Sequence, residues 1–355
     1  MKCMHTETSY PLAPLTSFKT GGAAETAIIL DDISQFDDAL ERASGAPFWF
    51  LGYGSNSLVS DQGLPGTTFV MRTGSIRNEG DLIVADAGVW WDDLVQHAIA
   101  HGLWGFECMS AIPGGVGAAV VGNIAAYGQA VADTLVWVEV CDSTSGTCRK
   151  MEATELGLQY RKSELLQSNR SLVVLRAAFR LSETPVKDLV YESAVAIAAS
   201  NNFDLNTLAG RRETIIKARD GAGSLWDYRD ESAARTAGSF FRNPLVDTQT
   251  AERIMSYDET GKSLELLKKM NQVHGGESSR VSAAHVLLAA GFERGQTWGD
   301  VRLHPQHVLK IENAGRATSQ EIYDVSQEII ETVKTKLGVT LEPEIRTLGE
   351  FDQKT

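Results

Sequence analysis

Residues 52–57 read GYGSNS, and residues 112–128 read IPGGVGAAVVGNIAAYG. Both stretches are rich in glycine and almost free of charged side chains, so a ligand could lie close to the main chain and meet its N–H groups. Read alone, the first could be an ordinary tight turn and the second a close-packed helix joined to turns. Two such stretches, about 60 residues apart in one region, instead indicate a dinucleotide cofactor that is held mainly by backbone.

The first stretch is not the glycine fingerprint of a Rossmann fold. It follows an apolar segment, 47–51, but Ser57 stands where the third glycine belongs, and no amphipathic helix begins there. We therefore expect a cofactor-binding fold of another kind, in which Ser55, Asn56 and Ser57 add side-chain donors to those of the backbone.

Hydrophobic periodicity around the two stretches predicts a mixture of strands and helices. We expect strands at 26–30, 47–51, 82–88, 171–181, 308–313 and 339–349, with a hairpin at 136–151. We expect helices at 34–43, 92–101, 194–200, 208–219, 281–292 and 318–338. The last helix has the clearest limits, because Thr318 and Glu321 form a capping box and Gly338 follows its apolar face. The pattern is that of an α+β protein, with a domain boundary in the polar segment 220–238.

Composition and charge exclude several classes of function. The chain has 355 residues and a formal net charge of −13, whereas proteins that bind nucleic acid or a membrane surface need a basic face. The N-terminus has no apolar core of a signal peptide, and no run of about 18 apolar residues could cross a membrane. We expect a cytoplasmic protein that binds neither nucleic acid nor membrane.

Cysteines and histidines give no metal or disulfide framework. Of the four cysteines, Cys141 and Cys148 flank the hairpin turn and could meet across it, although reduced thiols are the expected state in the cytoplasm. His97 and His101 have the i,i+4 spacing of a helical ligand pair, but no third ligand accompanies them. We expect no metal.

Residues 237–244 read AGSFFRNP, and the role of Ser239 is open. Its local context fits a small residue in a turn. Its hydroxyl could also donate a proton, but an unactivated serine is a poor acid and could serve only a strongly basic carbanion. Likewise, Arg161 could be a surface charge or a carboxylate ligand, and Glu344 an exposed edge residue or a stabiliser of charge.

Five motifs taken together resemble the UDP-N-acetylenolpyruvoylglucosamine reductase family. They are the two glycine-rich stretches, YRKS at 160–163, GSFFRNP at 238–244 and EPEIR at 342–346, and the likeness extends from about Leu15 to Gly349. The resemblance implies a two-part FAD-binding unit of the vanillyl-alcohol-oxidase/CO-dehydrogenase-flavoprotein type and an α+β substrate-binding domain. The corresponding ranges are 1–73, 74–226 with 338–355, and 227–337.

The resemblance also implies a reaction. FAD would be bound non-covalently and reduced by NADPH, and a monomer would then reduce UDP-N-acetylglucosamine enolpyruvate to UDP-N-acetylmuramate for peptidoglycan. Hydride from flavin N5 would reach the enolpyruvyl β-carbon, and Ser239 would protonate the α-carbon. Arg161 and Glu344 would stabilise the negative charge of the intermediate.

Further binding residues follow from the same resemblance. The cofactor would contact Gly52, Tyr53, Gly54, Ser55, Asn56, Ser57, Ile112, Pro113, Gly114, Gly117, Ala118, Gly122, Asn123 and Ala126. The substrate would contact Tyr127, Tyr160, Tyr191, Arg242, Asn243 and Lys217, with Arg219 as a second candidate cation for a diphosphate and His307 as a residue that could line the site. The chain departs from the family pattern at Tyr53, where glycine is usual, at Arg242, where lysine is usual, and in the segment after Arg219.

Two alternatives remain open on the sequence. Another flavoenzyme of the same fold should lack the combination of Arg161, Ser239 and Glu344, and could carry a residue attached to its flavin. A nucleotide-sugar-binding protein without catalysis would not oxidise NADPH.

Overall fold

The computed structural model describes residues 4–43, 47–159, 163–167, 172–265, 267 and 278–353. The chain forms two compact units. Unit 1 comprises Met1–Tyr10, Ala24–Gly54 and Leu64–Ala233, and unit 2 comprises Pro11–Ala23, Ser55–Gly63 and Ala234–Thr355. The boundary thus divides the first glycine-rich stretch between Gly54 and Ser55. The expected three-domain division, with 338–355 joined to 74–226, stays a prediction.

Unit 1 begins with a small sheet in which β2, β5 and β3 run parallel. Its strand order is β1 (His5–Pro11), β2 (Ala23–Leu30), β5 (Leu64–Met71) and β3 (Phe48–Leu51). Phe50 and Phe69 are partners in neighbouring strands, and their rings stack at 4.8 Å between centroids, which adds to the stabilisation from apolar burial. The helix between β2 and β3, α1 (Phe36–Arg42), begins two residues after the predicted start at residue 34, because Asp32 accepts the Ser34 N–H and starts a short 3₁₀ turn there.

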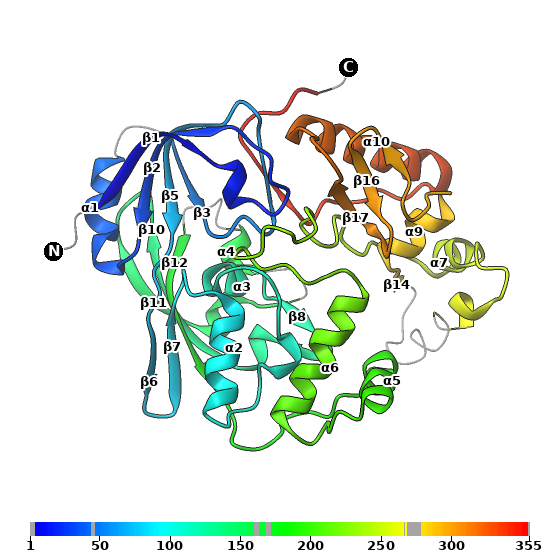
Figure 1. The fold of residues 1–355 in the computed structure, drawn as a ribbon, viewed down its shortest axis with the longest axis horizontal. Coiled ribbons are helices and arrows are strands. Elements are labelled where there is room, and N and C mark those ends of the chain that lie inside the picture. The colour runs from blue at the N-terminus through cyan, green and yellow to red at the C-terminus, as the bar shows by residue number, and fades with distance from the viewer. Residues whose placement is uncertain are drawn as a thin grey trace. The chain divides into compact units, whose positions relative to one another are not determined.

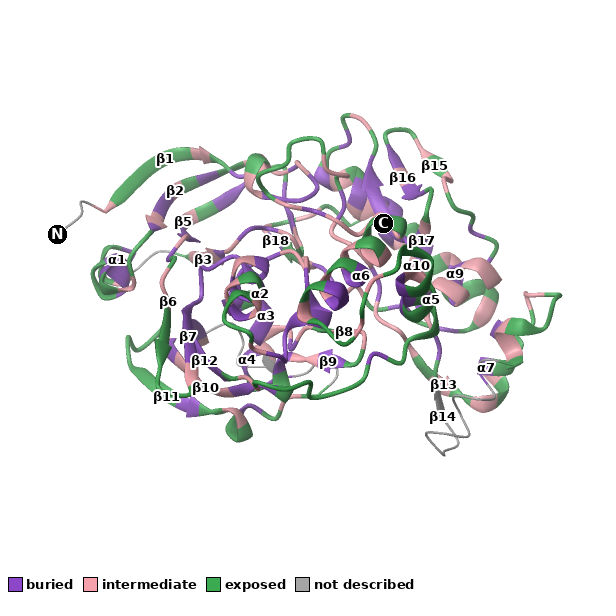
Figure 2. Cartoon of the chain, turned by 60° about the horizontal axis from the view of Figure 1, so that its bottom comes forward, coloured by how far each residue is buried: buried purple, intermediate pink, exposed green. Residues whose placement is uncertain are grey.

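A second sheet of unit 1 is antiparallel. Its order is β11 (Cys148–Glu152), β10 (Leu135–Asp142), β12 (Leu172–Arg180), β7 (Leu82–Asp86) and β6 (Ile76–Glu79). Figure 2 shows the edge strand β6 largely exposed, whereas β7 and β12 in the middle of the sheet are largely buried. The helices α2 (Trp91–Ala100) and α3 (Val116–Val121) contribute to the same apolar core.

The cysteine pair at the end of the β10–β11 hairpin meets across the turn, as the sequence allowed. Cys141 and Cys148 are cross-strand partners with their sulfur atoms in contact, and the reduced state of the pair stays a prediction. Cys108 is free and buried, and burial raises the pKa of its thiol to about 12.

Helices α5 (Glu192–Asn201) and α6 (Leu208–Gly221) pack against one another, and buried charges anchor α6 within unit 1. The guanidinium of Arg211 donates to Glu107 at 3.2 Å and to the Lys187 carbonyl at 2.6 Å. Arg212 forms two hydrogen bonds of 2.7 Å to Asp92. A buried ion pair of this kind strongly favours one arrangement, because separating its partners would leave a charge uncompensated.

Unit 2 contains a three-stranded antiparallel sheet covered by helices. The strands are β15 (Thr297–Trp298), β16 (Val301–His304) and β17 (His307–Asn313), and the helices are α7 (Thr248–Met255), α9 (Ala283–Ala289) and α10 (Ser319–Leu337). Figure 1 shows α9 and α10 beside β16 and β17, and their apolar side chains form the core of this unit.

Two expectations for unit 2 have different outcomes. The capping box of α10 is confirmed: Thr318 accepts from the Glu321 N–H at 3.1 Å, and Glu321 accepts from the Thr318 N–H at 2.8 Å. The expected strand 339–349 is wrong over most of its length, since only β18 (Arg346–Leu348) is a strand, paired in parallel with β4 (Ser57–Val59). The residues before it pair with other partners, and Pro343 has no N–H to continue a ladder.

Among the described residues, no helix is long and apolar enough to span a membrane, and no group of three or more His, Cys, Asp or Glu side chains could hold a metal ion.

The capping box predicts a measurable contribution to stability. Thr318→Ala removes the acceptor for the Glu321 N–H and should lower the free energy of unfolding by about 1 kcal/mol, measured by denaturant titration of far-UV circular dichroism. Thr335→Ala, on the exposed face of the same helix, is the matched control and should change it by less than about 0.5 kcal/mol. Equal effects of the two substitutions would contradict the capping assignment.

Candidate active site and comparison with known proteins

The C-terminal segment 342–346 connects two parts of unit 2 that are far apart in sequence. On one side the Glu344 N–H donates to the Phe240 carbonyl at 2.8 Å, and Phe241 and Pro343 are antiparallel partners. On the other side the Asn56 side chain donates to the Glu344 carbonyl at 3.2 Å, and the Arg346 N–H donates to the Asn56 carbonyl at 3.0 Å. The segment thereby brings Asn56, Glu344 and the neighbour of Ser239 together.

Ser239 lies on a turn with open space beside it. Gly238 has φ of +79°, a left-handed conformation that favours glycine, and a Cβ added there would meet no atom within 4 Å. The next two residues anchor the turn: Phe240 and Phe241 are almost fully buried, and the Phe240 N–H donates to the Leu309 carbonyl of β17 at 2.9 Å. Ser239 itself is half-buried. Among the described residues, no side chain hydrogen-bonds to its hydroxyl.

Arg242 and Asn243 extend this segment, and both side chains have structural neighbours. Arg242 lies 3.7 Å from Glu342, and both side chains are well exposed. The Asn243 side-chain oxygen accepts from the Ala283 N–H at 2.9 Å, at the start of α9. The amide NH₂ is therefore the end of Asn243 that is left to contact a ligand.

The two halves of the first glycine-rich stretch have different surroundings. In unit 1, Gly52 faces open space, since an added Cβ would meet nothing within 4 Å, and Gly54 has φ of +58°. The Tyr53 side chain turns inward and donates to the Gly88 carbonyl at 2.9 Å, and burial raises its pKa to about 12. In unit 2, the Ser55 carbonyl accepts weakly from the Ser17 hydroxyl at 3.4 Å, and Ser57 begins β4.

Several glycines of the second stretch serve the packing of the protein itself. A Cβ on Gly115 would lie 2.9 Å from the Ala87 carbonyl oxygen, and one on Gly117 would lie 2.8 Å from the Ala87 Cβ, so both allow α3 to approach the end of β7. Asn123 uses both ends of its side chain within the protein. Gly114 is also buried, whereas the remaining expected contacts retain accessible surface; these are Ile112, Pro113, Ala118, Gly122 and Ala126.

Two of the residues expected to contact the substrate, Tyr191 and Arg219, lie near a third, Tyr127, in unit 1. Its ring meets that of Tyr191 edge-on at 5.7 Å between centroids. Arg219 is close enough to act electrostatically on Tyr127, and burial lowers the pKa of its guanidinium. One guanidinium nitrogen donates to the Ser224 carbonyl at 2.8 Å, while Nε is buried without an acceptor among the described residues. Lys217, by contrast, is exposed on α6.

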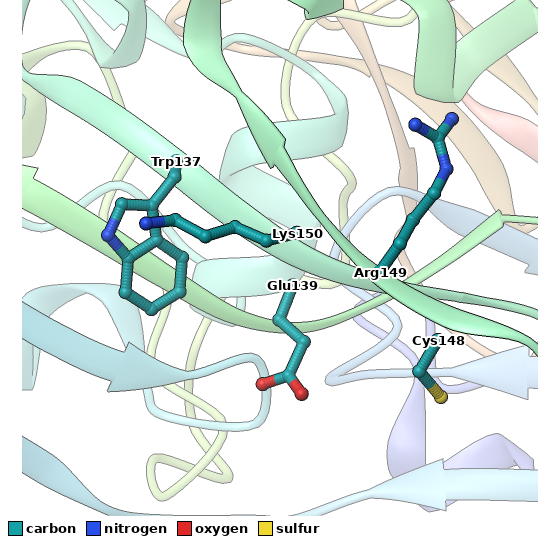
Figure 3. A pocket seen from close by; sticks show the side chains of 5 residues that line it. All are labelled: Trp137, Glu139, Cys148, Arg149 and Lys150. Carbon is teal, nitrogen blue, oxygen red and sulfur yellow. The ribbon is translucent and has the colours of Figure 1, made fainter.

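The remaining expected residues are Tyr160, Arg161 and His307. Tyr160 and Arg161 fall outside the described residues. His307 is at the start of β17, and burial lowers its pKa to about 4, with Lys310 and Arg294 acting in the same direction. A surface hollow of about 310 Å³ on the β10–β11 hairpin is lined by Trp137, Glu139, Cys148, Arg149 and Lys150, none of them expected in a site (Figure 3).

Comparison with known proteins assigns the family. The model of the UDP-N-acetylenolpyruvoylglucosamine reductase C-terminal domain matches residues 230–348, and that of an FAD-binding domain matches residues 25–152. The chain is 32% identical over 349 residues to the UDP-N-acetylenolpyruvoylglucosamine reductase of Streptomyces coelicolor, covering 96% of this chain and 89% of that protein. It is 33% identical over 347 residues to the enzyme of that name from Saccharopolyspora erythraea, covering 94% and 93%.

A solved structure supports the fold. The crystal structure of UDP-N-acetylenolpyruvylglucosamine reductase from Thermus caldophilus superposes with a TM-score of 0.66, covering 98% of this chain and 100% of that chain at 24% identity. The expected fold, an FAD-binding unit with an α+β C-terminal domain, is confirmed. The chain belongs to the UDP-N-acetylenolpyruvoylglucosamine reductase family and is an FAD-binding oxidoreductase.

Proposed function

We propose that this chain reduces the enolpyruvyl ether of UDP-N-acetylglucosamine to UDP-N-acetylmuramate, with electrons supplied by NADPH through FAD. The observation that carries the proposal is the pairing of segment 342–346 with Phe240 and Asn56. This pairing brings together three parts of unit 2: Glu344, the turn that carries Ser239, and the part of the first glycine-rich stretch that contains Asn56. The family assignment supports the overall reaction, and the roles of single residues are proposals.

The residues of unit 1 fit a dinucleotide. Gly52 leaves open space beside a loop whose next glycine has a left-handed backbone, as a closely approaching cofactor requires. We assign FAD binding to both glycine-rich stretches, with Gly114, Gly117 and Asn123 supporting the shape of the second one from within. When bound, FAD would supply the hydride-transfer chemistry between NADPH and the enolpyruvyl β-carbon.

Addition of hydride to the β-carbon places negative charge on the α-carbon and its carboxylate. Arg161 would bind that carboxylate in bidentate fashion and stay charged throughout. Glu344 would act beside it, either as a protonated donor to the growing charge or as an ionised group that orients Arg161. The hydrogen bonds to Phe240 and Asn56 fix the backbone of Glu344, and so the position from which its side chain extends.

Ser239 would complete the reaction by donating a proton to the α-carbon. A serine is acidic enough for this only because the carbanion is strongly basic. No described side chain hydrogen-bonds to the hydroxyl, so no histidine or carboxylate prepares it as a nucleophile, and it is free to point at a substrate. The open space beside Gly238 allows a substrate atom to approach.

We assign the diphosphate of the sugar nucleotide to Arg219 with Tyr127 and Tyr191. A buried guanidinium nitrogen without an acceptor is costly unless a ligand supplies one, and Arg219 Nε is such a group. Lys217 is solvated and would contribute only long-range attraction. Arg242 and the amide NH₂ of Asn243 would contact the nucleotide part, and Tyr160 the sugar.

The overall reaction can be tested on the purified protein by visible absorbance. Anaerobic NADPH should bleach the flavin bands, and only the enolpyruvyl sugar nucleotide should restore them, with formation of UDP-N-acetylmuramate detected by mass spectrometry. A protein that binds no flavin after addition of FAD, or whose reduced flavin is not reoxidised by the sugar, would contradict the proposal.

Removal of the Ser239 hydroxyl should separate the two half-reactions. Ser239→Ala should leave flavin reduction by NADPH unchanged and slow reoxidation by the sugar by about 100- to 10,000-fold, the range of general acid catalysis, measured by stopped-flow absorbance. Ser256→Ala, in which the lost hydroxyl donates only to the Arg253 carbonyl of α7, is the matched control. Wild-type reoxidation in Ser239→Ala would remove Ser239 from the mechanism.

Loss of the Arg219 charge should weaken binding of the sugar nucleotide. Arg219→Met removes a charge-assisted interaction of about 1.5–3 kcal/mol and should raise KM for the sugar by roughly 10- to 100-fold with kcat changed little. Arg180→Met, at an exposed pair with Asp81, is the control for loss of an arginine from unit 1. An unchanged KM in Arg219→Met, or a larger increase in Lys217→Met, would show that the diphosphate cation has been assigned wrongly.

A further inference from the structure

Unit 1 has a small aromatic cluster that is separate from its main core. Tyr53, Trp90 and Trp226 are buried there together, and the half-exposed ring of Tyr228 packs on two of them. The Tyr53 ring centroid is 4.8 Å from that of Trp90 and 4.5 Å from that of Tyr228. Trp90 lies 5.1 Å from Tyr228 and 6.0 Å from Trp226.

The cluster joins the two glycine-rich stretches. Tyr53 belongs to the first, and its hydroxyl donates to the Gly88 carbonyl. Trp90 pairs with Gly115 of the second, and the Trp91 N–H donates to the Gly114 carbonyl at 2.8 Å. The short segment 88–91 thus forms hydrogen bonds with both stretches. The rings of Tyr53 and Trp90 are in contact beside these hydrogen bonds.

Arg72 holds the first stretch from its other side. Its guanidinium lies over the Tyr53 ring, 4.5 Å from the centroid, and donates to the Gly52 carbonyl at 3.0 Å. The Arg72 guanidinium therefore contacts both the backbone of Gly52 and the ring of Tyr53. Because of this shared contact, we expect a movement of the Tyr53 ring to change the conformation of the loop at Gly52.

Residues 224–229, which we call the strap, pack against Tyr53 and Trp90. The strap follows Arg219 in the chain and remains bonded to it, since the Ser224 N–H donates to the Arg219 carbonyl at 2.7 Å. Trp226 and Tyr228 supply its contacts with Trp90 and Tyr53. Arg229 donates twice to Asp93 at 2.9 Å, but both side chains are nearly half exposed, and exposed ion pairs contribute little. The aromatic contacts of Trp226 and Tyr228, together with the hydrogen bonds between Ser224 and Arg219, therefore attach the strap to the rest of unit 1.

We propose that Trp226 and Tyr228 are positioning residues for the cofactor: by holding the strap against Tyr53 and Trp90 they keep both glycine-rich stretches in the conformation that retains FAD. The proposal rests on the proposed function, which assigns FAD to these stretches. It predicts that loosening the strap acts on FAD release and leaves the chemistry of bound FAD unchanged. Neither residue touches the reacting atoms in this account.

The test is the rate of FAD release from the holoenzyme, followed by the rise of flavin fluorescence after dilution. Tyr228→Ala and Trp226→Leu should each accelerate release at least tenfold, whereas Tyr228→Phe, which keeps the ring, should stay within twofold of wild type. Asp93→Asn should also stay within twofold, because the ion pair contributes little. At saturating FAD, flavin reduction by NADPH in both accelerated variants should match wild type.

A matched control separates this role from a general loss of packing. Trp137→Leu removes a half-buried tryptophan of the same unit that stacks with Lys150, and it should leave FAD release unchanged. Release within twofold of wild type in both Tyr228→Ala and Trp226→Leu, or equal acceleration in Trp137→Leu, would overturn the proposal. A wild-type protein that binds no FAD would instead contradict the proposed function itself.

Discussion

The backbone hydrogen bonds of residues 342–346 are the constraint on which unit 2 depends. The N–H of Glu344 donates to the Phe240 carbonyl and the N–H of Arg346 to the Asn56 carbonyl, so one short segment connects two residues, Asn56 and Phe240, that are far apart in the chain. Because Pro343 lacks an N–H, the segment cannot continue as a regular strand, and it changes partner within three residues. Any displacement of this segment would move Glu344, the Ser239 turn and the loop at Asn56 together.

Glycine has two different uses in this chain. At Gly115 and Gly117 a side chain would collide with Ala87, so these positions need glycine. Gly52 and Gly238, in contrast, have open space beside them. The first pair lets the protein pack against itself, and the second pair leaves room for a ligand. Both stretches lie within residues 25–152, which an FAD-binding domain model matches, but glycine content does not tell which glycines contact the cofactor.

Local signals in the sequence were sufficient for much of the fold. The capping box at Thr318 and Glu321 and the glycine at 338 define α10 because all of their interactions lie within a few residues. The segment 339–349 could not be predicted in the same way, since its partners come from residues 56–59 and 240–242. For the site, the resemblance named Ser239 and Glu344, and their roles stay predictions. The difference between exposed Lys217 and partly buried Arg219, and the contacts of Trp226, depend on tertiary packing, which no local pattern encodes.

The central claim is that Ser239 and Glu344 act on one intermediate as a single arrangement that the C-terminal segment holds together. A double-mutant cycle of Ser239→Ala and Glu344→Gln, measured on flavin reoxidation by the enolpyruvyl sugar nucleotide, tests it most directly. The account predicts strong non-additivity, with the double variant little slower than the slower single variant. Effects that multiply in the double variant would show two independent contributions and contradict the account.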